Sequence, residues 1–225
     1  MKKILLSLST LALLGSTTLN AELLMGVEYN VMSSMTGTET YETGGSREYD
    51  FTYQPIKFKV GFGSPESIYL YGYFQSAEQE YDAGGSSESI SEFGLDLVVQ
   101  MDVGVKHVKP FIKIGAGAGR YVPDNITVDE DGYYDEDNEI FSVILKAGAG
   151  VSYYITPKIE LLAGVDYKYA SWDDSMYDNM ATKEDTGVNV FVGINLWPFA
   201  VDPEIEAAKA AEKEAAEYNR QTGIY

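Results

Sequence analysis

The chain has 225 residues, no cysteine, and 35 acidic against 16 basic residues, a formal net charge of −19. The lack of cysteine excludes disulfides, thiolate metal sites and a lipid-modified N-terminal cysteine. The negative charge argues against DNA or RNA as a partner, because phosphates would be repelled. The length gives room for one domain with a small appendage.

Residues 1–21 have the layout of a secretory signal peptide. Lys2 and Lys3 give a positive start, residues 4–14 form an apolar core, and residues 16–21 are mostly small or polar. The apolar core is too short to cross a bilayer as a helix, for which about 20 residues are needed. We therefore expect cleavage after Ala21 and export. Loss of Lys2 and Lys3 changes the net charge from −19 to −21.

Alternation of apolar with small or polar residues predicts eight β-strands within residues 22–199, because successive strand residues face opposite sides. The predicted strands are 23–32, 55–63, 67–75, 92–106, 109–121, 141–155, 159–169 and 187–196. Most exceed the 5–6 residues or so that are common in soluble sheets, and they suit tilted strands that cross a membrane. The strand at 67–75 has tyrosines on one face and apolar residues on the other, and its faces are left unassigned.

The connections between these strands alternate in length. Three are tight turns, in GSPES, VKHVKP and ITPK, and four are longer and polar, at about 34–50, 82–90, 122–138 and 172–186. The long ones hold 18 acidic and two basic residues. Short periplasmic turns and long outer loops are typical of up-and-down membrane barrels. The sequence therefore predicts an all-β, eight-stranded antiparallel transmembrane β-barrel with acidic loops outside.

The polar strand faces carry a nearly balanced set of charges. The acidic members are Glu28, Asp96, Asp102, Glu160 and Asp166, and the basic members are Lys57, Lys59, Lys106, Lys113, Lys146 and Lys168. An eight-stranded barrel is just wide enough for side chains to fill it, and unpaired charge is costly away from water. We expect the apolar face to meet lipid and the charges to form a network inside. The alternative is a soluble barrel or sandwich with the apolar face inside.

The segment AGAGVSYYITPKIELLAGVDYKY, residues 147–169, resembles the OmpA-like, or porin-family, outer-membrane β-barrels. The likeness lies in a Gly-Ala-Gly strand, a paired Tyr, a Thr-Pro turn and the returning strand. KPFIKIGAGAGRY, residues 109–121, resembles the preceding strand of the same families. The resemblance implies the cell outer membrane, contact with its lipid and lipopolysaccharide, and insertion by the barrel-assembly machinery. Members often end the last strand with an aromatic residue, for which Phe199 is the candidate here.

Aromatic residues gather near the predicted strand ends. Tyr153, Tyr154, Tyr167, Trp172 and Trp197 are among them. Tyrosine and tryptophan favour membrane surfaces, where an amphipathic ring meets both lipid and water. We therefore interpret these side chains as aromatic belts.

The tail, residues 200–225, differs in kind from the rest. Asp202 suits the N-cap of a helix and Pro203 its first position, and alanine, glutamate and lysine continue the helix to about residue 219. We expect a periplasmic helix with a solvated, charged surface. Contact with a periplasmic partner and closure of the barrel from below are the other roles considered.

Little in the sequence points to catalysis or to a cofactor. The single histidine, His107, lies in a predicted short turn with no nucleophile assigned to it. Asp129, Asp131, Asp135 and Asp137 could supply oxygen ligands to calcium, although an EF-hand alignment lacks its first acid and its final glutamate. A solvated acidic loop is the simpler interpretation.

The expected function is non-enzymatic, structural or surface-interacting, in the cell envelope. A small-solute porin-type channel is the alternative, against which the charged lumen argues. An enzyme ranks third. The ligand of the loops is not indicated by the sequence.

Overall fold

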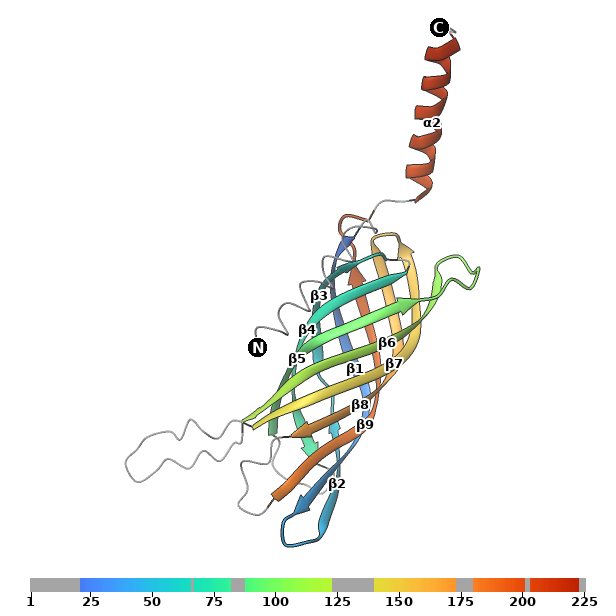
Figure 1. Cartoon of the computed structure of the whole chain (residues 1–225). Helices are drawn as coiled ribbons and strands as arrows, with labels where there is room; N and C mark the ends of the chain where they lie inside the picture. The colour runs from blue at the N-terminus through green and yellow to red at the C-terminus, as the bar shows by residue number, and fades with distance from the viewer. Residues whose placement is uncertain are drawn as a thin grey trace, which may run out of the picture.

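The computed structural model describes residues 21–65, 67–81, 88–122, 140–172, 180–200 and 203–222, and its strands close into one antiparallel barrel (Figure 1). From β3 to β9 neighbouring strands in the sheet follow chain order, and β1 pairs with β9 to close it. The elements are β1 (Glu22–Tyr41), β2 (Ser46–Tyr53), β3 (Ile56–Gly63), β4 (Ile68–Tyr81), β5 (Glu88–Gln100), β6 (Val108–Val122), β7 (Ile140–Thr156), β8 (Ile159–Trp172), β9 (Met180–Leu196) and α2 (Pro203–Thr222).

The nine described strands fill eight positions in the barrel, as the sequence predicts. Both β2 and β3 lie between β1 and β4 and pair with each of them. They form one barrel strand that is interrupted at Gln54 and Pro55. Proline has no backbone N–H to give to a ladder, which explains a break at this point.

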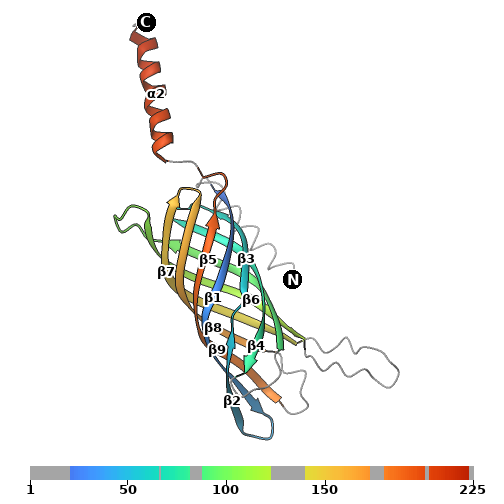
Figure 2. The same ribbon diagram turned by 180° about the vertical axis from the view of Figure 1, so that it is seen from behind.

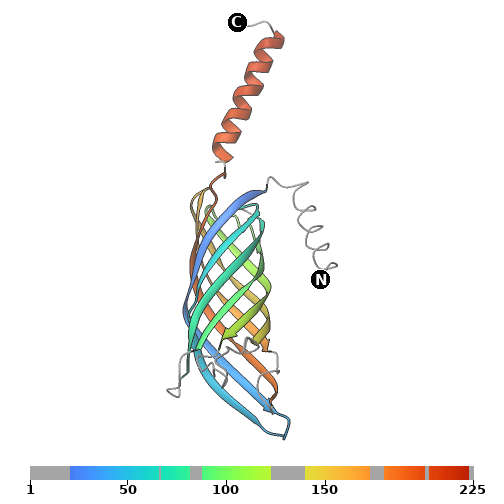
Figure 3. The same cartoon turned by 90° about the vertical axis from the view of Figure 1, so that its left-hand side faces the viewer.

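The end of the barrel that carries the longer predicted connections is more regular than predicted. Residues 34–50 are not a loop, because β1 and β2 continue as a hairpin with a turn at 42–45 that projects beyond the other strands (Figure 3). Gly44 and Gly45 occupy this turn with φ of 82° and 114°, which suits glycine. Strand β9 likewise begins at Met180 instead of residue 187. Residues 82–87, 123–139 and 173–179 of the other long connections lie outside the described residues.

The opposite end has three short connections, as expected, but one is misplaced in the prediction. Strand β5 ends at Gln100, and residues 101–107 form the turn, although the sequence assigned residues 101–106 to the strand. Gly104 and His107 take positive φ values of 73° and 67° there. The Asp102 carboxylate also accepts a hydrogen bond of 2.9 Å from the Gly104 N–H. This Asx-type turn ends the strand despite the continued alternation of apolar residues.

The outer wall of the barrel is apolar. Phe58, Val60, Ile114, Val143 and Tyr167 are each more than half exposed on it. In strand β9 the outward apolar side chains run from Val188 to Leu196. Nine residues tilted by about 40° cover about 20 Å of height, close to the apolar band of about 25 Å on membrane barrels.

The structure settles the faces of the strand that the sequence left open. Tyr69, Tyr71 and Tyr73 of β4 are buried inside the barrel, whereas Phe74 is half exposed on the wall. The tyrosines therefore belong to the lumen.

Helix α2 lies outside the barrel, beyond the end that carries the short turns (Figures 1 and 2). It begins at Pro203, as predicted, and runs to Thr222, three residues further than expected. The placement gives no support to closure of the barrel by the helix. Within the described ranges, no helix combines the length and apolarity needed to cross a bilayer.

We predict that Val192→Lys, at the middle of the apolar wall, lowers the free energy of unfolding in lipid vesicles by about 2–4 kcal/mol, because the charge must be removed from water. Thr182→Lys, on the exposed outer part of the same strand, is the control and should change it by less than about 0.5 kcal/mol. Denaturant titration followed by tryptophan fluorescence measures both. Equal effects of the two variants would contradict the lipid-facing assignment.

Candidate functional site: the charged lumen

The lumen of the barrel holds a balanced set of buried charges. Nine of the eleven predicted network residues point into it, and three further residues join them. The buried charged residues in the described part of the chain are Glu28, Glu92, Asp96, Glu160, Asp166 and Asp185 with Lys57, Lys59, Lys113, Lys146, Lys168 and Lys183. Six carboxylates face six ammonium groups, so the formal charge of this set is zero.

The centre of the network is Glu28 on β1. Lys57 Nζ lies 2.6 Å from Glu28 Oε1, Lys113 Nζ lies 3.3 Å from the same oxygen, and Lys59 Nζ lies 3.3 Å from Glu28 Oε2. All four side chains are almost completely buried. One carboxylate therefore holds three lysines together at a depth where none could remain charged alone.

Two further carboxylates, those of Asp96 and Asp166, offset the excess of positive charge around Glu28. Lys113 Nζ also lies 2.8 Å from Asp166 Oδ2, and Lys57 Nζ lies 3.6 Å from Asp96 Oδ2. These contacts join strands that are not neighbours in the sheet, β6 to β8 and β3 to β5, and the contact of Lys113 with Glu28 joins β6 to β1. The network thus crosses the bore instead of lining it.

Strand register explains why these groups meet. Glu28 is the direct partner of Lys57 in the β1–β3 ladder, and directly opposed residues on one face lie closest. On its other side Glu28 faces Gly193 of β9, and at Gly26, two residues before Glu28, a Cβ would lie 3.1 Å from Lys59 Cε. Gly148 similarly faces Asp166, and a Cβ at Gly148 would lie 2.1 Å from Asp166 Oδ1. The glycine-rich inner faces therefore give the charged side chains their space.

Lys146 occupies a different environment from the other lysines at this level. Its Nζ lies 3.6 Å from the centroid of the Tyr73 ring, a cation–π geometry. Among the described residues, Lys146 Nζ has no hydrogen-bond partner. The Tyr73 ring is therefore its closest stabilising contact in the structure.

Glu160, at the end with the short turns, is held by neutral groups instead of lysines. It accepts hydrogen bonds from Ser152 Oγ at 2.5 Å, Gln100 Nε2 at 2.7 Å, Asn195 Nδ2 at 2.8 Å and Trp197 Nε1 at 3.0 Å. Several hydrogen bonds to one carboxylate can replace its hydration shell. This cluster links four strands and the residue that follows β9.

The outer part of the lumen contains the residues that sequence reasoning missed. Glu92 pairs with Lys168 and accepts a hydrogen bond of 2.7 Å from Gln75 Nε2. Asp185 accepts one of 2.5 Å from Trp172 Nε1. Glu92 has the same parity as Asp96 in its strand, so continued alternation would have identified it. Lys183 and Asp185 were placed in a predicted loop that is in fact part of β9.

Two apolar clusters close the network from both sides. One includes Leu24, Phe111, Phe191 and Trp197 together with the inward tyrosines of β4, and the other contains Met35, Phe51, Tyr53, Ile90 and Trp172. Trp172, Trp197 and Tyr154 are therefore lumen residues and not members of an aromatic belt, whereas Tyr153 and Tyr167 face outward. The bore is filled along its length by side chains.

Asp102 and Lys106 lie outside this lumen, contrary to prediction. Both are exposed in the turn after β5, where Asp102 Oδ1 lies 3.5 Å from Lys109 Nζ. The hydrogen bond from the Gly104 N–H, and then the charge of Lys109, lower the pKa of Asp102. Asp102 and Lys106 occupy alternate positions that would face inward if β5 continued, but the strand ends at Gln100.

The other residues singled out in the sequence are not part of the lumen. Asp129, Asp131, Asp135 and Asp137 lie outside the described residues. His107 is exposed in a turn, where its carbonyl oxygen accepts a hydrogen bond of 2.8 Å from Tyr154 N. Phe199 follows the end of β9 and is 68% exposed, so it is not part of the final strand. Within the described ranges, no group of three or more His, Cys, Asp or Glu side chains could hold a metal ion.

Comparison with known proteins identifies the fold but not a family. No family of proteins and no curated protein matches the sequence. Neisserial surface protein A (NspA) is similar in structure, with a TM-score of 0.50, 15% identity, and coverage of 79% of this chain and 99% of that one. The outer membrane protein AlkL has a TM-score of 0.46 and 12% identity, and the match covers 83% of this chain and 95% of AlkL. Ail of Yersinia pestis has a TM-score of 0.37 and 10% identity, and the match covers 78% of this chain and 99% of Ail. The likeness to NspA shows the eight-stranded outer-membrane barrel fold, and not membership of the OmpA-like or porin family.

We predict that Glu28→Gln lowers the free energy of unfolding by about 3–5 kcal/mol, because it leaves three buried lysines without their shared carboxylate. Asp102→Asn is the matched control, and it should cost less than about 0.5 kcal/mol because the side chain is exposed. Urea unfolding in lipid vesicles measures both variants. A small effect of Glu28→Gln would show that the central lysines do not depend on this carboxylate.

Proposed function

We propose that this chain is a non-enzymatic protein of the bacterial outer membrane, where it has a structural or surface-interaction role. The outward apolar wall supports the location, because such a continuous surface would be unfavourable in water. The likeness to a solved outer-membrane barrel supports the same location. Outer-membrane lipid, including lipopolysaccharide, and the barrel-assembly machinery are the partners that this location implies.

The observation that carries this proposal is the filled lumen. Glu28 and Lys113 bridge opposite walls, and the clusters around Trp172 and Trp197 lie on either side of them. Ions that crossed the bore would have to displace paired charges and packed aromatic rings. The geometry therefore favours a closed barrel over the porin-type channel that the family resemblance would suggest.

The projecting β1–β2 hairpin supports a role at the surface. Glu42, Arg47, Glu48 and Asp50 are exposed on it, well beyond the apolar wall. A regular hairpin with polar, exposed side chains presents a defined surface to the outside, which a rigid barrel holds in place. The acidic composition of the outer connections gives that surface a negative charge.

The proposal of a non-enzymatic role rests on the described part of the chain. His107 lies in a turn, and its ring centroid is 6.4 Å from that of Tyr153 and outside the lumen. The buried carboxylates are taken up by lysines and amide, hydroxyl and indole donors.

We predict no steady conductance when the refolded protein is inserted into planar lipid bilayers, because both ends of the bore are packed. The double variant Trp172→Ala/Trp197→Ala removes the largest side chain of each cluster and should give measurable current. Both proteins are first shown to be folded by a mobility shift between unheated and boiled samples on a gel. Stable wild-type currents whose ion selectivity changes in Lys146→Gln would establish the channel instead.

A further inference from the structure

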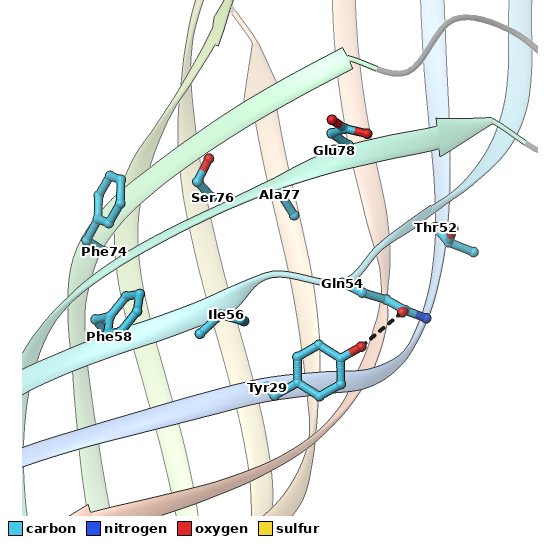
Figure 4. A pocket seen from close by; sticks show the side chains of 9 residues that line it. All are labelled: Tyr29, Thr52, Gln54, Ile56, Phe58, Phe74, Ser76, Ala77 and Glu78. Atoms are coloured by element: carbon cyan, nitrogen blue, oxygen red, sulfur yellow. Dashed lines mark hydrogen bonds between the residues drawn. The ribbon is translucent and has the colours of Figure 1, made fainter.

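A groove of about 570 Å³ lies on the outer wall where β3 gives way to β2 (Figure 4). The ladder between β3 and β4 ends at the pair Ile56 and Ser76, and the ladder between β2 and β4 begins at Tyr53 and Gln79. The wall is therefore open over a short distance without loss of barrel closure. The residues between the two ladders are Gln54, Pro55, Ala77 and Glu78.

The groove has an apolar end and a polar end. Phe58 and Phe74 lie together at one end and are each more than half exposed (Figure 4). Thr52, Gln54 and Glu78 lie toward the other end. The Tyr29 hydroxyl donates a hydrogen bond of 3.3 Å to Gln54 Oε1, which orients the amide. This is the lining expected for an amphiphile with one acyl chain and one polar group.

The groove lies at the edge of the apolar wall that is nearer to the β1–β2 hairpin. Along β4 the outward side chains are Ile68, Leu70 and Phe74, and the polar Ser76 and Glu78 follow. Its apolar end therefore continues the lipid-facing surface, and its polar end lies at the level of lipid head groups. A solute dissolved in water would have to enter the membrane to reach the apolar end of the groove.

We propose that this groove binds a membrane lipid with an uncharged, hydroxyl-rich head group, that is, a glycolipid. The inference rests on the membrane location in the proposed function but goes beyond it. The acyl chain lies against Phe58 and Phe74. The head-group hydroxyls donate to the Glu78 carboxylate and exchange hydrogen bonds with the Gln54 amide and the Ser76 hydroxyl.

The charge of the groove selects this head group. None of the nine lining residues is basic, and Glu78 is acidic. A phosphate head group would therefore be repelled and would find no cation among them. An ammonium group would pair with Glu78 but leave the amide and hydroxyl groups unused, whereas a sugar uses both donors and acceptors.

A second hollow on the wall provides the matched control. Its volume is about 660 Å³, and its lining, which includes Val27, Val151, Leu161, Ala163 and Val192, is almost wholly apolar. It can receive an acyl chain, and although Tyr153 and Tyr29, which it shares with the groove, are among its lining residues, it has no charged or amide side chain to distinguish one head group from another. A residue that fills this hollow should leave head-group preference unchanged.

The test is native mass spectrometry of the full chain, refolded in dodecyldimethylamine oxide and mixed with equal amounts of two lipids. A glucosyl diacylglycerol and a phosphatidylglycerol with the same acyl chains are the probes. We expect the wild type to retain the glycolipid about tenfold better, the difference that a hydrogen bond to a charged group supplies. Ser76→Trp, which fills the groove, should abolish the preference, and Ala163→Trp should leave it intact.

Equal retention of the two lipids, a preference for the phosphorylated lipid, or an undiminished preference in Ser76→Trp would overturn the proposal. A loss of the glycolipid preference in Ala163→Trp as large as that in Ser76→Trp would also overturn the proposal. Each variant is first examined for the heat-dependent mobility shift of a folded barrel. Failure of the wild type to fold in detergent would contradict the membrane barrel itself, whereas folded protein without the preference contradicts only the lipid site.

Discussion

The pairing of charges inside a narrow barrel is the constraint on which the rest of this structure depends. A lysine buried in the lumen needs a stabilising partner, which is a carboxylate for Lys57, Lys113 and Lys168 and the Tyr73 ring for Lys146. Each such partner must come from a strand of fitting register. Glu28 meets this condition for three lysines at once. The glycine-rich inner faces, the inward tyrosines and the closed bore all follow from the need to fit these pairs into little space.

The same constraint separates the two ends of the molecule. At the end with the short turns, Glu160 is bound by neutral donors and covered by Trp197. Toward the β1–β2 hairpin, Glu92 pairs with Lys168 and Asp185 accepts a hydrogen bond from Trp172, and the barrel then gives way to the exposed hairpin. The barrel thus acts as a support filled by its own side chains, and variation is accommodated best in the segments that project from it.

Much of the fold could be predicted from the sequence, because alternation over long strands reports directly on which face meets lipid and which faces inward. The eight strand positions, the three short connections at one end, the helix after Pro203 and most inward charges were accessible in this way. Strand ends were not, since Asp102 and Gly104 terminate β5 through turn geometry that alternation does not encode. Asp185 was missed for the converse reason: β9 continues into a segment whose polar composition is typical of a loop. The partners of each charge depend on register, which no single strand reveals.

The links across the lumen also bear on how the chain enters a membrane. Glu28 lies on the first strand, yet it contacts Lys113 of β6, which in turn contacts Asp166 of β8. Strands that entered the bilayer one at a time would each carry bare charges into lipid until the last of them arrived. The inner face must therefore be curled and largely paired before it leaves water, so insertion and closure of this barrel are expected to be a single concerted step.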